Sequence, residues 1–368
     1  MTDRRRIIRV NRLLLFVALV QLSLSVMVAA YKLITNQQTD VLTMLIVFQA
    51  AILVPTLIYL LCFKEQDKDI ISIKGISLVT ILIVSLLGLM IQPIVSLVNL
   101  VSMLFTTNGI SAAMNAVKNM SLGLKLFAIA LLPAIGEELL FRGLIYGSYR
   151  KKGMYNALIL SALLFGLLHM NLNQFLYATI LGIFLVLLME TTGNIIAPMI
   201  VHFVFNGTSV IINHFASSIG EVVYTTETIM KSIVSVIPAA IIATPITVAL
   251  FWFLGKQFNS LEHIKNIFRD RHLTSYNCAN PVFQPNMNGA VTFCGGDTKG
   301  YKHDDTVTYL NGKSYYGEEK ESQSISLSPL IAMTDKKAKR VNSLLTPCLL
   351  LFILFCLCFI VATQFTLI

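Results

Sequence analysis

Residues 122–146 read LGLKLFAIALLPAIGEELLFRGLIY, an apolar stretch whose centre holds Glu137, Glu138 and Arg142. A helix needs about 20 mostly apolar residues to cross the hydrocarbon core of a bilayer. The stretch is long enough to do so. It therefore predicts a transmembrane helix that carries two carboxylates and one guanidinium within the membrane.

The composition of the whole chain favours the same class of protein. Hydrophobic residues make up 55% of its 368 residues and charged residues 13%, and the mean hydropathy is +0.74. A soluble domain normally carries about a quarter of charged residues. This chain has too little polar surface to cover a water-soluble fold, so we expect an all-α, polytopic transmembrane helical bundle.

Apolar segments recur along the chain and give about eight to nine candidate spans, with one polar extramembrane insertion. The candidates are roughly residues 13–31, 41–63, 76–105, 122–146, 157–169, 175–189, 195–212, 233–254 and 344–365. The expected organisation is N-terminal transmembrane helices (1–121), a helical core (122–213), a further transmembrane helix (214–258), the insertion (259–343) and a C-terminal transmembrane helix (344–368). Within the insertion, residues 291–293 and 306–310 could form short strands.

The net charge of +9 is concentrated in clusters, and five arginines lie within the first twelve residues. Basic clusters beside apolar runs typically set orientation, with the positive residues on the cytoplasmic side. We therefore expect a cytoplasmic N-terminus. The hydropathy argues against nucleic acid as the partner of these basic residues, and the lipid bilayer is the expected one.

The charges inside residues 122–146 differ in their spacing. Glu138 and Arg142 are four residues apart, so they share a helical face and can form an ion pair. Glu137 points about 100° away around the helix. The spacing predicts a structural Glu138–Arg142 pair and a Glu137 that projects into a cavity, although one arginine can also hold two carboxylates.

Two further spans carry polar residues. His169 ends the apolar run 157–169, and His202 and Asn206, four residues apart, share one face of the run 195–212. Taken singly, each is more typical of an interface residue or an interhelical hydrogen bond. Their coincidence with Glu137 within about seventy residues predicts a common site.

These residue types are suited to hydrolysis of a peptide bond. A carboxylate beside a histidine can deprotonate water, and a histidine with an asparagine amide can stabilise an oxyanion. Two histidines and a glutamate also match the ligands of a catalytic zinc ion. The spacing leaves open both a metal-independent site and a zinc site formed by Glu137, His169 and His202.

The chain resembles the CAAX-protease and bacteriocin-processing (CPBP) family of intramembrane endopeptidases, which is related to the type II CAAX prenyl endopeptidase. The family pattern is EExxxR, then FxxxH, then HxxxN, each on its own helix. It is complete and in order here, as Glu137–Arg142, Phe165–His169 and His202–Asn206. The resemblance covers roughly residues 122–213, about a quarter of the chain.

The resemblance implies roles for six residues. Glu137 and His169 would activate a water molecule, and His202 with Asn206 would stabilise the oxyanion. Glu138 and Arg142 would be structural. It implies an intramembrane endopeptidase that requires no cofactor, with zinc as the alternative, and a membrane-associated peptide or protein as substrate. We expect this protein in the plasma membrane of a prokaryote, where a leader peptide, pheromone precursor or membrane-bound regulator fits better than a prenylated protein.

Other classes of membrane protein remain as alternatives. Intramembrane Glu and His residues also serve transporters and proton relays, but no inverted repeat, a common transporter mark, is evident. A non-proteolytic immunity protein could keep the same residues for folding. The sequence contains no HExxH motif, which argues against a protease of the usual zinc class.

Overall fold

The structure is a computed structural model that describes most of the chain. The described residues are 3–37, 39–67, 70–106, 117, 119–216, 225–273, 284–285, 291–293, 307–310, 313–316 and 344–365. They divide into two compact units, residues 1–267 with 343–368, and residues 268–342. Most of the predicted insertion lies outside the described residues.

Every predicted span contains helix. The long elements are α1 (Asp3–Thr35), α2 (Val41–Asp67), α3 (Leu78–Ser102), α8 (Met154–Leu168), α9 (Leu172–Thr192), α10 (Ile196–Ala216), α11 (Thr226–Gln257), α12 (Leu261–Leu273) and α14 (Pro347–Phe365). Among the described residues, six helices are long and apolar enough to cross a membrane, and α8 and α14 are shorter apolar helices. The protein is an integral membrane protein, and its first unit is the all-α polytopic bundle that the composition predicts.

The fourth predicted span is helical but not uniform. It comprises α5 (Leu122–Lys125), the π-helical η1 (Leu126–Leu131), α6 (Leu132–Glu138) and the π-helical η2 (Leu139–Tyr146). The short α7 (Gly147–Tyr149) and the 3-10 turn η3 (Arg150–Lys152) follow it. Glu137 and Glu138 therefore end a short α-helical stretch between two π-helical ones. Such π-helical insertions are frequent at functional sites.

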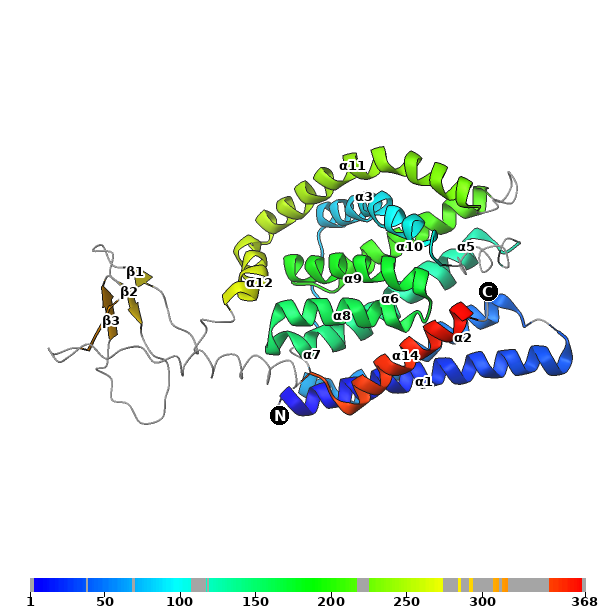
Figure 1. Cartoon of the computed structure of the whole chain (residues 1–368), viewed down its shortest axis with the longest axis horizontal. Coiled ribbons are helices and arrows are strands. Elements are labelled where there is room, and N and C mark those ends of the chain that lie inside the picture. Colours follow the sequence, from blue (N-terminus) through cyan, green and yellow to red (C-terminus); the bar gives the residue numbers. More distant parts are fainter. Residues whose placement is uncertain are drawn as a thin grey trace. The chain divides into compact units, whose positions relative to one another are not determined.

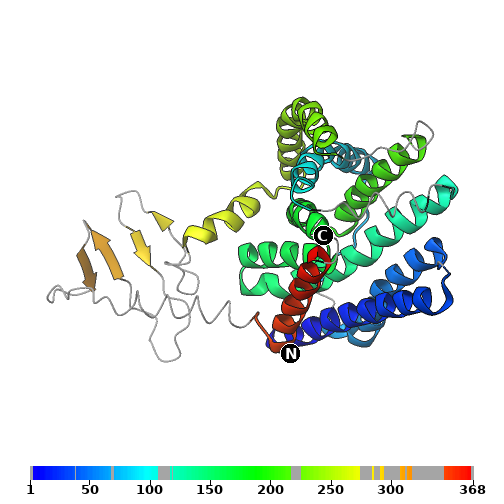
Figure 2. The same ribbon diagram turned by 45° about the vertical axis from the view of Figure 1, so that its right-hand side comes forward.

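The helices of the first unit lie side by side around α8 and α9 (Figures 1 and 2). α11 curves along α3, which also contacts α9 and α10, whereas α1 lies between α2 and α14. The segment that carries Glu137 contacts α2, α8 and α10. This arrangement brings the three motif-bearing segments together.

A buried polar contact fixes the C-terminal helix against α1. The Asn11 Nδ2 amide donates to the Leu344 carbonyl at 3.2 Å and to Thr346 Oγ1 at 2.9 Å. The Asn11 Oδ1 oxygen accepts from the Tyr149 hydroxyl. Because both ends of the Asn11 amide are used, this one side chain joins α1, α7 and the start of α14 inside the bundle.

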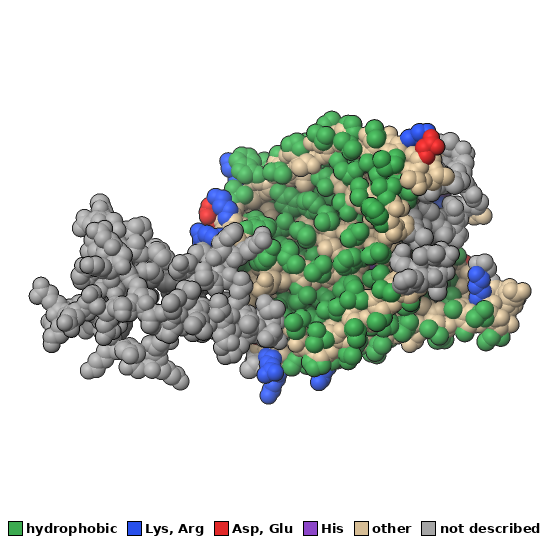
Figure 3. Space-filling view, viewed as in Figure 1, with side chains coloured by type: hydrophobic (Ala, Val, Ile, Leu, Met, Phe, Trp, Pro, Cys, Tyr) green, Lys and Arg blue, Asp and Glu red, His purple; other side chains and the backbone are tan. Residues whose placement is uncertain are grey.

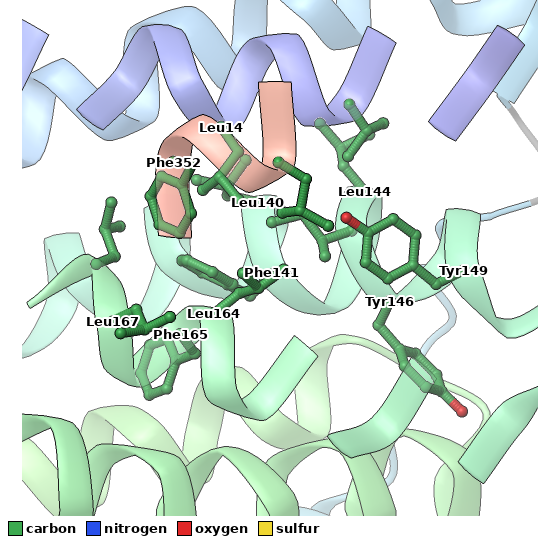
Figure 4. Packing of buried hydrophobic residues seen from close by; sticks show 14 of the residues in the cluster. Leu14, Leu140, Phe141, Leu144, Tyr146, Tyr149, Leu164, Phe165, Leu167 and Phe352 are labelled. Carbon is green, nitrogen blue, oxygen red and sulfur yellow. The ribbon is translucent and has the colours of Figure 1, made fainter. Parts of the chain in front are cut away.

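Apolar side chains fill the space between these helices. Figure 4 shows Leu14 of α1, Phe352 of α14, Phe141 of η2 and Phe165 of α8 packed together, and all four are buried. The outer faces are also apolar. Figure 3 shows hydrophobic side chains over the middle of the visible face of this unit and charged residues toward its ends, as expected for a surface in contact with lipid.

Small residues let α8 and α9 approach closely. A Cβ on Gly166 would overlap Thr179 Oγ1 and lie 2.7 Å from the Phe175 carbonyl oxygen, and a Cβ on Gly182 would lie 3.1 Å from Ala162 Cα. Close backbone approach through glycine is typical of helix pairs in membranes. This contact sets the position of Phe165, beside Gly166, and of His169 at the end of α8.

Gly166→Ala is therefore expected to destabilise the bundle by about 1–3 kcal/mol, because the added methyl group cannot be accommodated without moving α8 away from α9. Thermal unfolding in detergent measures the loss. Gly123→Ala is the matched control, since a Cβ there meets nothing within 4 Å. Equal stability of the two variants would contradict the close packing of α8 on α9.

The second unit contains a small antiparallel sheet of order β1-β2-β3-β4. Its strands are β1 (Gln284–Pro285), β2 (Val291–Phe293), β3 (Val307–Leu310) and β4 (Lys313–Tyr316). Val291 pairs with Tyr309, and Tyr309 with Ser314. The two predicted strands in the insertion are confirmed as β2 and β3.

Candidate active site

A cavity of about 410 Å³ lies inside the first unit, lined by residues of α2, α3, η1, α6, α8, α9 and α10. Four of the six predicted site residues line it, namely Glu137, His169, His202 and Asn206. Glu138 and Arg142 are completely buried behind it. The three motifs therefore meet at one cavity, with Glu137 in its lining and the Glu138–Arg142 ion pair outside it.

Glu137 faces the cavity from the last turn of α6. Its carboxylate accepts a hydrogen bond at Oε1 from Gln49 Nε2, at 3.4 Å, and its Oε2 lies 3.9 Å from His202 Nε2. The side chain is 8% exposed. A carboxylate with one oxygen supported by an amide and the other beside an imidazole can hold and deprotonate a water molecule.

Glu138 contacts two of the other site residues. Its Oε1 accepts from Arg142 Nη1 at 2.9 Å and from His202 Nδ1 at 2.8 Å. The predicted ion pair is present, and the contact with His202 is additional. Because a carboxylate accepts, Nδ1 of His202 carries a proton, so its Nε2 is the nitrogen that faces Glu137.

Arg142 provides the balancing positive charge in this buried cluster. Its Nη2 donates to the Gly182 carbonyl at 3.4 Å, and its guanidinium carbon lies 4.3 Å from the centre of the Phe165 ring. The same ring meets His169 and His202 edge-on, at centroid distances of 5.2 and 5.9 Å. The Phe165 ring thus packs against the arginine and both histidines.

His169 caps the C-terminal end of α8. Its Nδ1 is 2.9 Å from the carbonyl oxygen of Phe165. Because a carbonyl can only accept, Nδ1 is the protonated nitrogen, and Nε2 of a neutral ring keeps its lone pair. A histidine held in this way can accept a proton at the cavity.

Asn206 lies one helical turn after His202 on α10. Its Nδ2 donates to the Ile129 carbonyl of η1 at 3.2 Å. A carboxamide nitrogen has two hydrogens, so one is left for a second acceptor. The contact fixes the orientation of the amide, with the nitrogen toward η1.

The zinc alternative requires three ligand side chains around one point. Among the residues that the structure describes, no group of three His, Cys, Asp or Glu side chains is placed to hold a metal ion. Glu137, His169 and His202 line one cavity without forming such a group.

Reasoning from the sequence missed the polar residues that the other helices contribute. Gln49 of α2 contacts Glu137, and Gln92 and Asn99 of α3 line the cavity with Gln174 and Tyr177 of α9. Three of these are uncharged amides inside predicted spans 41–63 and 76–105. Polar residues within apolar spans were the available signal, as they were for Glu137.

The comparison with family models agrees with the motifs. Residues 119–208 match a family model described as Rce1-like, type II CAAX prenyl endopeptidase Rce1-like. The match covers about a quarter of the chain and contains all six site residues, so the resemblance to CAAX-type proteases is confirmed for this segment. No curated protein and no solved structure matches the chain.

Proposed function

We propose that this protein is an intramembrane endopeptidase that hydrolyses a peptide bond of a membrane-associated protein or peptide. The observation that carries the proposal is the placement of Glu137, His169, His202 and Asn206 around one cavity within the bundle. The match of residues 119–208 to the family model of Rce1-like, type II CAAX prenyl endopeptidases supports a CAAX-type protease in general. The residue roles below are our proposal.

Glu137 acts as general base toward a water molecule in the cavity, with the Nε2 lone pair of His169 supporting the same water. The water oxygen adds to the carbonyl carbon of the scissile bond while its proton passes to Glu137. Glu137 then gives that proton to the leaving nitrogen as the carbon–nitrogen bond breaks. No covalent intermediate with the enzyme is formed.

The oxyanion formed by this addition needs donors. Asn206 has a remaining amide hydrogen, and His202 donates through Nε2 when the ring is protonated at both nitrogens. The Glu138 carboxylate, 2.8 Å from His202 Nδ1, supports the positive ring. Glu138 and Arg142 are buried and do not line the cavity, so we assign them as positioning residues.

The alternatives make different predictions. A zinc protease would lose its activity to a chelator and regain it with zinc, whereas the mechanism proposed here is unaffected by chelation. A transporter would move ions or solutes across proteoliposomes without cleaving peptides. An immunity protein would do neither in isolation.

We also propose that the protein lies in the plasma membrane of a prokaryote. The N-terminal arginines favour a cytoplasmic N-terminus. The described residues include no cysteine close to that terminus. A single cysteine introduced at Asp3 tests the orientation. It should resist a membrane-impermeant thiol reagent in intact cells, and labelling there would reverse the topology.

His169→Ala is expected to lower the rate of cleavage of a membrane-anchored peptide by about 10²-fold, because general acid–base catalysis typically raises a reaction rate by 10²-fold or more. The assay uses the full chain in proteoliposomes and follows product by mass spectrometry. His263→Ala is the matched control, since His263 contacts Glu190 at 2.5 Å and does not line the cavity. Full activity of His169→Ala would remove His169 from the mechanism.

A further inference from the structure

The cavity occupies the half of the first unit that lies toward α5. The long helices in its wall line it with the parts nearest that end, for example Gln49 near the start of α2, Asn99 near the end of α3, His169 at the end of α8, Gln174 near the start of α9 and Asn213 near the end of α10. In Figure 1, α5 lies at the right-hand end of the unit, and the N-terminus and α7 lie at the left-hand end. We call these the α5 end and the N-terminal end.

Lysine and arginine residues are unequally divided between the two ends. At the N-terminal end, 11 of them lie in residues 3–12, 70–77, 147–153 and 256–265. At the α5 end, three lie in residues 32–37, 119–125, 169–171 and 225–231. Basic residues beside membrane spans are typical of the cytoplasmic side. The asymmetry favours a cytoplasmic N-terminal end, with the half of the unit that holds the cavity toward the opposite face of the membrane.

Two rows of polar side chains line the cavity on α10 and α3, which contact each other. The α10 row consists of His202, Asn206, Ser209 and Asn213, and the α3 row of Gln92, Ser96 and Asn99. Within each row the residues are three or four positions apart, so they share one helical face. His202, at the inner end of the α10 row, is 2% exposed, whereas Asn213, at the α5 end, is exposed. Polar rows of this kind inside a membrane protein favour a water-filled path, here from the α5 end to the site.

An apolar layer lies on the other side of the cavity. It includes Leu87 and Ile91 of α3, Leu185 and Leu188 of α9, and Ala197 and Val201 of α10, none of which is more than 1% exposed. On all three helices these residues lie beyond the cavity lining, toward the N-terminal end. Every residue of η2, which continues from α6 toward that end, is also buried. This packed layer separates Glu137 from the N-terminal end.

We propose that the cavity receives water and substrate from the extracytoplasmic side, and that the substrate is an exported peptide held in the outer half of the membrane by an apolar segment. The inference rests on the proposed function and adds the side of the membrane from which the site is reached. A protein anchored to the cytoplasmic face would meet the apolar layer instead of the polar rows. The scissile bond of the substrate therefore lies toward the outer end of its apolar segment.

Labelling of single cysteines with an anionic, membrane-impermeant methanethiosulfonate tests the side on which the cavity opens. The background is the full chain with its six cysteines replaced by alanine, and Ser96→Cys or Ser209→Cys places one thiol in the cavity lining. Both should be labelled in intact cells of a host with a single membrane. Val248→Cys, on the outer surface of α11 where the valine is 63% exposed, should react at least about tenfold more slowly, because a thiol surrounded by lipid does not form the reactive thiolate.

Two exposed glycines give matched controls for the two ends. A Cβ on Gly123, at the α5 end, or on Gly75, at the N-terminal end, would meet nothing within 4 Å. Gly123→Cys should be labelled in intact cells, and Gly75→Cys only after the membrane is permeabilised. In the chain with its natural cysteines, an epitope tag inserted at either glycine gives the same information through antibody binding, so the test does not depend on the folding of the cysteine-free background.

The outcomes separate the side of the cavity from the protease mechanism, because labelling does not depend on cleavage. Labelling of Ser96→Cys and Ser209→Cys only after permeabilisation would overturn the inference and leave the proposed function standing. Absence of labelling at both positions from either side would also overturn it, since the cavity would then be closed to water. Labelling in intact cells, without cleavage of any membrane-anchored peptide by the wild type, would support the side of the cavity and overturn the proposed function.

Discussion

Glu137→Gln is expected to abolish peptide cleavage, with kcat lower by about 10²- to 10⁴-fold, because the variant keeps the size of the side chain and loses the base. The glutamine can still accept from Gln49 and can still lie beside His202. It cannot take a proton from water. Cleavage of a membrane-anchored peptide by the purified chain in proteoliposomes, followed as initial rate at saturating peptide, measures the effect.

The control is Glu227→Gln on α11, where the carboxylate is exposed and pairs with Lys231 at 2.6 Å. This variant also lacks one negative charge, but Glu227 does not line the cavity, so the variant should keep full activity. Both variants should elute as the wild type does in size-exclusion chromatography. A Glu137→Gln enzyme that retained more than a tenth of the wild-type rate would show that another group activates the water.

Arg142→Met is expected to destabilise the bundle by about 3–5 kcal/mol, because it leaves the Glu138 carboxylate buried without its cationic partner. Both side chains are completely inaccessible to solvent, and their closest atoms are 2.9 Å apart. Methionine fills most of the volume against Phe165, so the loss reports the charge rather than a cavity. Unfolding in a denaturing detergent titration gives the free energy of unfolding.

Removing both charges should be milder than removing one. The double variant Glu138→Met with Arg142→Met has no uncompensated buried charge from this pair and should recover part of the lost stability. Lys231→Met, which breaks an exposed pair, should cost less than about 1 kcal/mol. If the Arg142→Met variant lost no more unfolding free energy than the Lys231→Met variant, the Glu138–Arg142 pair would not stabilise the bundle as proposed.

The transmembrane helices of the first unit could be predicted from the composition of the chain, and one buried ion pair from the spacing of its charges. Long apolar runs such as 41–63 and 195–212 have one stable solution in a bilayer, a helix with internally bonded backbone. The four-residue spacing of Glu138 and Arg142 was equally informative, because it is local to one helix. The coincidence of His169, His202 and Asn206 with Glu137 within about seventy residues predicted a common site, and the family motifs then implied a role for each.

The pairing across helices could not be predicted in this way. The sequence suggests Glu137 beside His169, whereas the contacts of both carboxylates are with His202, which depends on how α6 packs on α10. The π-helical stretches η1 and η2 also change the rotation per residue, so a constant 100° does not describe this span. Gln49 reaches Glu137 across 88 residues of chain, and nothing local to Gln49 indicates that contact.

The most direct test of an intramembrane peptidase is mass spectrometry of membrane-anchored peptides incubated with the purified full chain in proteoliposomes that contain a metal chelator. The account predicts new peptide termini at one position within the membrane-embedded segment, formed by the wild type and by Glu227→Gln and absent with Glu137→Gln. Products formed equally by Glu137→Gln, or no cleavage of any peptide by the wild type, would contradict it.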